Sequence, residues 1–275
     1  MTKKRRVGLI GAGTIGGFVL DNVMAGKVGN AEIVVVCGRS EHSKGRDKVA
    51  EYGLPWVTDT EELFNYDLDA VVEVASQEAL EAVGEKILRA GIDLVPLSLG
   101  AFVDGDLLER LIAAATEGGS ILHVASGGIG SLDALQAAVI FGVDKVTMTT
   151  RKPPEAWKNI PYVDAMNLDL DNMKEPYLLY EGPARDCVKI FPQNINIAAA
   201  LSMAGIGFEK TIIRIFADPN VEYNTHEIYV EGKAGKYRIT FENVPVASNP
   251  KTTYQACLSI LAALQKLRNP FHMGT

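Results

Sequence analysis

Cysteine is scarce in this 275-residue chain, and its three cysteines, Cys37, Cys187 and Cys257, lie far apart. Their odd number and wide spacing fit neither a disulfide framework nor a cysteine-based metal site, so we expect free thiols in a reducing compartment. Long apolar runs are also missing, because no stretch reaches the roughly 18 residues of a membrane-spanning helix. The net charge of −7 argues against nucleic-acid binding. We therefore expect a cytoplasmic protein that binds neither nucleic acid nor a membrane.

Glycine, in contrast, is concentrated near the start of the chain, in "VGLIGAGTIGGFVLDNV" from Val7. The apolar run 6–10 before these glycines is typical of a buried parallel strand. The apolar residues after them recur at helical spacing, and the run 31–37 then has the composition of a second strand. The glycines therefore lie at the strand-to-helix turn of a β-α-β unit, which is the context of a dinucleotide-binding loop.

Each residue of this turn has an expected role at a bound pyrophosphate. Gly11 permits the tight turn, Gly13 lets the main chain approach the phosphates, and Gly16 allows the helix to pack closely on the strand. Thr14 and Ile15 open the helix, whose free N–H groups and partial positive charge favour an anion. The sequence therefore predicts a dinucleotide site.

The end of the second strand bears on which dinucleotide is bound. A site for NAD usually places Asp or Glu there to bind the ribose hydroxyls, but the sequence reads Val36-Cys37-Gly38-Arg39-Ser40. Arg39 could pair with a 2′-phosphate while Ser40 donates a hydrogen bond to it. Alternatively, Arg39 only stacks on the adenine, which suits either cofactor. We favour NADP, with use of NAD or of both left open.

The alternation of strand and helix continues to about residue 128. Strand-like runs cover 68–76, 92–102 and 120–128, with helical patterns at 77–91 and 104–119, where Asp104 or Asp106 is the expected cap. This rhythm predicts a Rossmann-type, doubly wound parallel sheet. The loops after its strands meet at one edge, where ligands bind. The small residues of these loops are therefore candidates for contacts with the nicotinamide half, namely Ala75, Ser76, Ser98–Ala101 and Ser126–Gly128.

The second half has a different pattern. The stretch 145–157 alternates like an antiparallel strand, 210–219 and the residues around 224–244 add more sheet, and "GKAG" at 232–235 is a hairpin signal. We expect a long helix over 249–269. The predicted domains are a dinucleotide-binding domain at 1–128 and a substrate and dimerisation domain with a mainly antiparallel sheet at 129–250. A C-terminal helix at 251–275 is expected to return to the first domain.

Several motifs across nearly the whole chain resemble those of the L-aspartate dehydrogenase family. They are "GLIGAGTIG", "SLGAF", "SGGIGSLDAL", "TRKPPEAW", "FPQNINIAAALSMAGIG", "ADPNVEYNTHEI" and "NPKTTYQA". The glycine loop occurs in many oxidoreductases, whereas "FPQNINIAAAL" followed thirty residues later by "NTHEI" is more specific. One departure is Gly128, where the family usually has alanine.

The resemblance implies oxidation of the α-amine of L-aspartate, with NAD(P)⁺ taking the hydride. The product would be iminosuccinate, which yields oxaloacetate and ammonia or feeds NAD biosynthesis. His226 corresponds to the catalytic histidine of the family, and histidine can exchange protons near neutral pH. Asn196 corresponds to its cofactor-contacting asparagine, although as a residue it is also a good helix cap, and Asn194 is the nearby alternative. The family further implies a homodimer.

A dicarboxylate substrate needs cationic or hydroxyl donors, since arginine can bind a carboxylate in a bidentate manner and lysine as a point charge. The candidates are Arg151, Lys152, Lys251 and Thr252, each of which could equally lie at the surface. The sequence predicts no metal site. Two alternatives stay open: another NAD(P)-dependent reductase, of the dihydrodipicolinate or homoserine type, and a nicotinamide-nucleotide sensor without catalysis.

Overall fold

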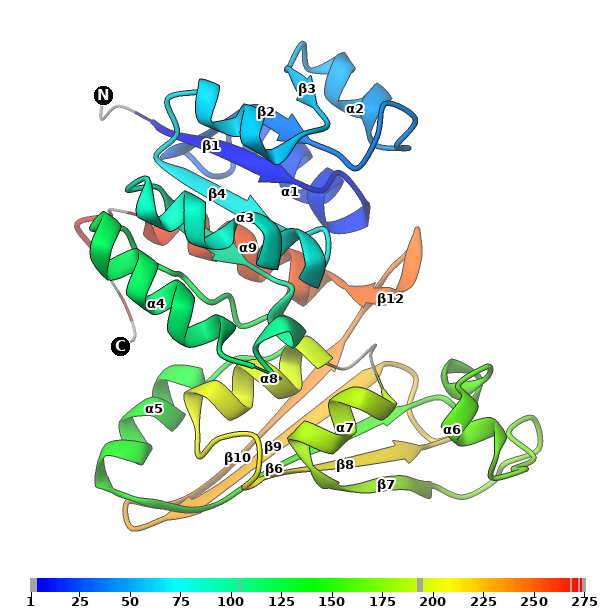
Figure 1. Ribbon diagram of the computed structural model, residues 1–275. Coiled ribbons are helices and arrows are strands. Elements are labelled where there is room, and N and C mark those ends of the chain that lie inside the picture. Colours follow the sequence, from blue (N-terminus) through cyan, green and yellow to red (C-terminus); the bar gives the residue numbers. More distant parts are fainter. Residues whose placement is uncertain (1–3, 104, 192–194, 268, 272, 274–275) are drawn as a thin grey trace. The chain divides into compact units, whose positions relative to one another are not determined.

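The computed structural model describes residues 4–103, 105–191, 195–267, 269–271 and 273. The chain divides into two compact units, each with its own sheet (Figure 1). Unit 1 comprises Met1–Gly127 and Ala256–Met273, and unit 2 comprises Gly128–Gln255 and Gly274–Thr275. The segment Ala256–Met273 thus belongs to the N-terminal unit.

Unit 1 is built on a parallel sheet with the strand order β3-β2-β1-β4-β5. Its strands are β1 (Arg5–Ile10), β2 (Ala31–Cys37), β3 (Trp56–Val57), β4 (Ala70–Glu73) and β5 (Asp93–Pro96). Chain order reverses between β1 and β4, so the sheet has a topological switch point beside the first strand. The prediction of a Rossmann-type parallel sheet is confirmed.

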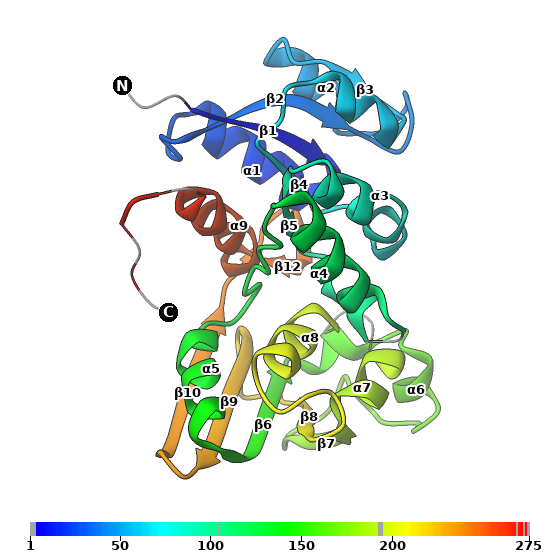
Figure 2. The same cartoon turned by 60° about the vertical axis from the view of Figure 1, so that its left-hand side comes forward.

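Helices cover both faces of this sheet, as Figures 1 and 2 show. One face carries α1 (Thr14–Met24) and α9 (Tyr254–Lys266), and Ile260 and Leu264 of α9 share a buried cluster with Val7 and Leu9 of β1. The other face carries the remaining long helices of the unit, α3 (Gln77–Arg89) and α4 (Leu107–Gly118). Three short helices lie in the connections, namely α2 (Arg46–Glu51), η1 (Thr60–Asn65) and η2 (Leu99–Phe102).

The prediction of a strand over 120–128 is wrong. Only Leu122 forms an isolated bridge there, to Leu94, because the next residues diverge from β5 and Gly127 turns with a positive φ of 66°. The fifth strand is instead β3, whose two residues are too few to show a period in the sequence.

Unit 2 contains a mixed sheet with the order β10-β9-β6-β8-β7, in which only the β6–β8 pair is parallel. Its strands are β6 (Val143–Lys152), β7 (Tyr177–Pro183), β8 (Thr211–Ala217), β9 (Asn224–Gly232) and β10 (Gly235–Asn243). The expected mainly antiparallel sheet is confirmed, as is the hairpin turn between Gly232 and Gly235. A two-stranded ribbon follows, formed by β11 (Pro245–Val246) and β12 (Asn249–Thr253).

Helices α5 (Leu132–Phe141), α7 (Ala184–Ile190) and α8 (Ile195–Ala204) lie over one face of this sheet (Figure 2). Burial alternates accordingly along β9, where Asn224, His226, Ile228 and Val230 are buried and the residues between them are half-exposed. The connection between β6 and β7 contains the short helices η3 (Pro154–Trp157) and α6 (Pro161–Asp164).

The C-terminal helix begins at Tyr254, so the predicted start at residue 249 is wrong. Asn249–Thr253 instead form β12, paired with β11. Proline restricts the residue before it to extended conformations, which favours a strand at this point. Among the described residues, no helix is both long and apolar enough to cross a membrane.

Candidate active site

The glycine turn after β1 has the geometry that a pyrophosphate requires. Gly11 has a φ of 96°, and a Cβ placed on it would lie 2.9 Å from the Cβ of Ala75. A Cβ on Gly16 would overlap the carbonyl oxygen of Gly11, so α1 packs here at a distance that only glycine permits. At Gly13, which precedes α1, a Cβ would have no other atom of the described residues within 4 Å beyond its two chain neighbours. The turn thus presents its main chain to a ligand at the start of an eleven-residue helix.

The loop after β2 lies beside this turn. A Cβ on Gly45 would overlap the carbonyl oxygen of Ala12, so the start of α2 meets the glycine turn directly. Arg39 is exposed and pairs with no carboxylate among the described residues. The amide of Ser40 donates to the hydroxyl of Ser43 at 3.2 Å, which closes the loop. The loop thus presents the Arg39 guanidinium and two serine hydroxyls, and the Glu41 carboxylate in the same loop pairs with Arg46 at 3.0 Å.

Ala75 and Ser76 follow β4 at the carboxyl edge of the same sheet. Ser76 caps α3, because its hydroxyl accepts a hydrogen bond from the amide of Ala79 at 3.2 Å. Their own amides donate to the carboxylate of Glu73, at 2.7 and 2.9 Å. The structure therefore brings the glycine turn, Ala75 and Ser76 together at one edge of unit 1.

His226 lies inside β9 of unit 2, not in a turn, and is 4% exposed. Its Nδ1 is 3.0 Å from the hydroxyl of Thr150, its neighbour on β6, and its Nε2 has no hydrogen bond to the residues that the structure describes. Burial and the nearby Lys152 ammonium lower the pKa of His226 to about 3. The imidazole is therefore neutral at physiological pH, as a proton acceptor must be.

Lys152 ends β6 on the same covered face as Thr150 and is 7% exposed. Its ammonium lies 5.0 Å from the ring centroid of Trp157, and no carboxylate pairs with it among the described residues. Trp157 is fixed in turn by hydrogen bonds from its indole nitrogen to the carbonyls of Phe216 and Lys152, at 3.1 and 3.4 Å. Burial lowers the pKa of Lys152 to about 8. A buried cation without a counter-charge is a ready site for a substrate carboxylate.

Arg151 points to the opposite face of the sheet. Its guanidinium lies 2.8 Å from the carboxylate of Asp218 and 4.3 Å from the ring centroid of Phe216. Because side chains alternate along a strand, Arg151 and Lys152 cannot both join His226. The structure brings only Lys152 there.

Two buried asparagines near His226 in the sheet of unit 2 were not predicted from the sequence. Asn224 and Asn243 are paired residues of β9 and β10, and both are buried beside the row that holds His226. Asn243 donates its side-chain amide to the carbonyl of Gly128 at 2.6 Å. Asparagine is disfavoured in strands, and two of them near strand ends are the signal that could have indicated a polar site. Thr150, which follows another threonine in a strand-like run, gave no such signal.

The other site residues predicted in unit 2 are not part of the polar cluster around His226. Asn196 is half-buried in the first turn of α8, so it lies inside the helix and is not its cap. Thr252 accepts a hydrogen bond from Asn249 at 3.5 Å, whereas Thr253 lies beside Gly128. The side chain of Lys251 lies outside the described residues, as do Asn194 and Asp104.

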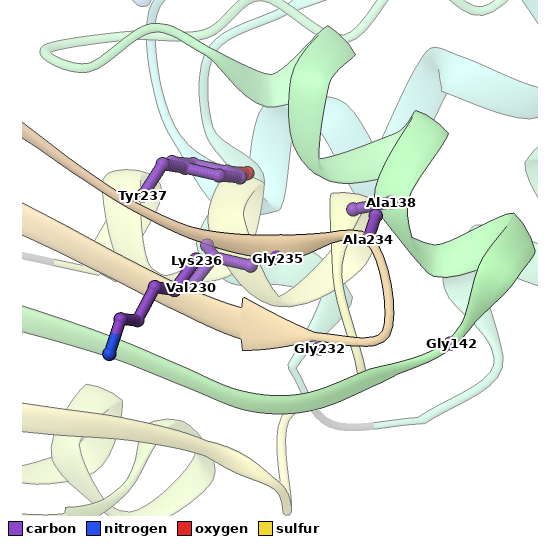
Figure 3. A pocket seen from close by; sticks show the side chains of 8 residues that line it. All are labelled: Ala138, Gly142, Val230, Gly232, Ala234, Gly235, Lys236 and Tyr237. Atoms are coloured by element: carbon purple, nitrogen blue, oxygen red, sulfur yellow. The ribbon is translucent and has the colours of Figure 1, made fainter.

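A small cavity of about 100 Å³ lies elsewhere in unit 2, at the β9–β10 hairpin (Figure 3). Small residues such as Ala138 and Gly235 line it, together with Tyr237, whose buried hydroxyl has no hydrogen-bond partner in the described part of the chain. It contacts β9 at Val230, four residues along the strand from His226, and so lies apart from the polar cluster. No group of three or more metal-ligating side chains occurs within the described part of the chain.

The parallel sheet with its glycine turn defines an NAD(P)-binding domain, and the chain is a dehydrogenase of two units. Residues 11–125 match the family model described as the NAD-binding domain of homoserine dehydrogenase. Residues 133–267 match the model described as the C-terminal domain of aspartate dehydrogenase.

Full-length relatives agree with these matches. The L-aspartate dehydrogenase of Methanosarcina mazei is 40% identical over 98% of this chain and 99% of its own length, and that of Ralstonia pickettii is 37% identical over 94% and 96%. The crystal structure of aspartate dehydrogenase from Thermotoga maritima superposes with a TM-score of 0.75 at 27% identity, covering 98% of this chain and 99% of that one. The chain belongs to the L-aspartate dehydrogenase family.

Proposed function

We propose that this protein oxidises the α-amine of L-aspartate with NAD(P)⁺ and forms iminosuccinate, which water converts to oxaloacetate and ammonia. The observation that carries the proposal is the buried Lys152 next to His226, which pairs with no carboxylate of the described residues, in a chain that is 40% identical to an L-aspartate dehydrogenase over nearly its whole length. Unit 1 serves as the dinucleotide-binding domain, and unit 2 provides the residues for the substrate.

When bound, the nicotinamide accepts the hydride from the substrate Cα. Lys152 holds one substrate carboxylate, and the buried amides of Asn224 and Asn243 provide hydrogen bonds at the same end of the sheet. This anchoring places the amine of the substrate beside His226. As the C–H electron pair leaves Cα, the nitrogen lone pair forms the C=N bond and one N–H proton passes to Nε2 of His226.

The same imidazole then serves the hydrolysis. After Nε2 has released the proton of the amine to solvent, the neutral imidazole accepts a proton from the water that adds to the imine carbon and returns one to the departing ammonia. The carboxylate that pairs with Lys152 offsets the effect of the ammonium on the imidazole, and so raises the pKa of His226 from its low value in the unliganded protein. Substrate binding thus makes His226 a better base.

For the cofactor we propose contacts from Gly11, Gly13, Thr14, Ile15, Gly16, Ala75 and Ser76 in unit 1, and from Gly128 and Asn196 in unit 2. We further propose that NADP is preferred, because Arg39 and Ser40 stand where an NAD site has a carboxylate. Replacing Arg39 with Gln tests this, since it should weaken NADP binding about tenfold and leave NAD binding unchanged. An equal effect on both cofactors would indicate stacking on adenine instead.

Two broader properties belong to the same proposal. The chain forms a homodimer through the sheet face of unit 2 opposite its helices, where Ile212, Phe216 and Tyr229 are half-exposed. Sedimentation equilibrium tests this, since a Phe216→Asp variant should be monomeric.

The three cysteines are buried and unpaired, which suits a cytoplasmic enzyme.

The deciding experiment follows nicotinamide absorbance on mixing the protein with NADP⁺ or NAD⁺ and a panel of amino acids that includes aspartate and homoserine. We expect reduction with L-aspartate and none with the other amino acids. Activity with homoserine alone would indicate the homoserine-type alternative. Cofactor binding without turnover across the panel would indicate a sensor.

A further inference from the structure

Glu73 is a buried carboxylate at the centre of unit 1 that the proposed mechanism does not use. It ends β4, which lies between β1 and β5 in the sheet, and its side chain is completely buried. No lysine or arginine pairs with it among the described residues. A buried charge of this kind is costly unless hydrogen bonds compensate it, so a side chain that only filled space would be better apolar.

Four hydrogen bonds do compensate it, and they come from two different loops. Its Oε1 accepts from the amides of Ala75 and Ser76, at 2.7 and 2.9 Å, and from the hydroxyl of Ser98 at 2.9 Å. Its Oε2 accepts from the amide of Ser98 at 3.3 Å. Burial raises the pKa of Glu73 and these hydrogen bonds lower it, with a net rise. One carboxylate thus joins the loop after β4 to the loop after β5.

The same loops border the glycine turn. Ala75 lies against Gly11, where a Cβ would come within 2.9 Å of the Cβ of Ala75. Gly11 itself is held from the other side, because its amide donates to the carbonyl of Cys37 at 2.8 Å. A shift of the loop after β4 would therefore change the shape of the sheet edge where ligands bind in such folds. The glycine turn that receives the phosphates is held independently, by the hydrogen bond from Gly11 to Cys37.

We propose that Glu73 is a positioning residue that fixes the loops after β4 and β5 for the nicotinamide half of the cofactor. The role rests on the proposed function, in which Ala75 and Ser76 contact the cofactor. Only an acceptor with two oxygens can serve amide donors of both loops at once. Glu73 touches no substrate and acts through the loops that it holds.

Glu73→Gln tests the role with little change in volume. The glutamine oxygen can still accept from Ala75, Ser76 and the Ser98 hydroxyl, but its NH₂ group then faces the amide of Ser98, which loses its acceptor. We expect the affinity for the whole dinucleotide and kcat each to fall about tenfold. Affinity for ADP, which lacks the nicotinamide half, should stay within about twofold, because the glycine turn keeps its own anchor.

Asp93→Asn is the matched control. Asp93 is a buried carboxylate of the same sheet that accepts from the amide of Ile121 at 2.8 Å, but it begins β5 and so lies at the opposite edge. This variant should lower Tm and leave the ratio of dinucleotide to ADP affinity unchanged. If Glu73→Gln does not fold, Ser98→Ala takes its place, because it removes one of the four bonds and should shift the ratio in the same direction by a smaller factor.

Two results with Glu73→Gln, or with Ser98→Ala in its place, would overturn the proposal. One is a lower Tm with unchanged affinities, as expected for Asp93→Asn. The other is an equal loss of affinity for ADP and for the dinucleotide. The affinity ratio does not depend on aspartate turnover. A wild-type protein inactive with aspartate would therefore refute the proposed function while the ratio still tested the role of Glu73.

Discussion

The two candidate sites of this chain are built in opposite ways. The cofactor site of unit 1 is a main-chain structure, in which Gly11, Gly13 and Gly16 lie in one short segment and work by lacking side chains. The polar cluster of unit 2 consists of side chains from three strands, with Thr150 and Lys152 on β6, Asn224 and His226 on β9, and Asn243 on β10. A site built from the main chain is visible in the sequence as a short run of closely spaced glycines. A site built from side chains of several strands is not, because strand register decides which side chains meet.

Loss of the His226 imidazole should give the largest effect on kcat. Because it should leave cofactor affinity unchanged, it distinguishes the polar cluster of unit 2 from the cofactor site of unit 1. We expect His226→Ala to lower kcat about a thousandfold, because it removes the group that exchanges protons with the substrate. The affinity for NADP⁺, measured by fluorescence titration, should not change. The control is His42→Ala, at an exposed histidine of unit 1, which should keep kcat. Activity of His226→Ala within tenfold of wild type would remove His226 from the mechanism.

Lys152→Met should impair function and increase stability. Without the ammonium, KM for aspartate should rise about a hundredfold. The pKa of Lys152 falls from 10.5 to about 8 on folding, so its charge destabilises the protein below pH 8, and the penalty is relieved as pH rises toward 10.5. The variant should therefore gain about 3 kcal/mol in free energy of unfolding at pH 7, measured in urea.

The matched control for this variant is the adjacent Arg151→Met. It breaks the ion pair with Asp218 on the other face of the sheet, and so should lower stability and leave KM unchanged. If instead Arg151→Met raised KM and Lys152→Met did not, the substrate carboxylate would bind on the opposite face.

The pH dependence of dicarboxylate binding tests the same lysine without catalysis. Succinate has no group that titrates above neutral pH, so the titration of the protein alone governs its affinity there. We expect constant affinity around pH 7 and a decline above pH 8, as the ammonium with its pKa of about 8 loses its proton. Calorimetric titration measures this. Affinity that stays constant well above pH 8 would contradict a role for Lys152.

A smaller effect is expected from the residue that holds His226. Thr150→Val keeps the branched shape but removes the hydroxyl 3.0 Å from Nδ1, so kcat should fall about tenfold. Thr150→Ser should restore most of the activity. Thr147→Val is the control, because the buried Thr147 hydroxyl has no hydrogen-bond partner among the residues that the structure describes. Equal kcat in the two valine variants would show that Thr150 does not position the imidazole.

The smallest effect is expected at Gly128, where the family usually has alanine. A Cβ there would lie 3.5 Å from Asn243 and Ile197, which is ordinary van der Waals contact. Gly128→Ala should therefore change kcat and NADP⁺ affinity by no more than about twofold. A loss of tenfold or more would mean that this chain depends on the absence of a side chain at this position.

The sequence predicted the architecture of both units because their long elements follow clear periods, as in the strand 6–10 and the helix after Gly13. It missed β3, which is too short to have a period, and it extended the last helix over β12. It could not separate Arg151 from Lys152, because the face that each occupies depends on register with β9. Glu73 and Asn243 were missed because Ser98 and Gly128, which they contact, are distant in the sequence. Asn224 was missed because its place beside Asn243 depends on strand register.

The most direct test of the central claim is a crystal structure of the protein with NADP⁺ and succinate. We predict the pyrophosphate on the main chain of Gly13 and one succinate carboxylate within hydrogen-bond distance of Lys152 Nζ, next to His226. Succinate bound at Arg151, or an imidazole of His226 without contact to the ligand, would contradict the account.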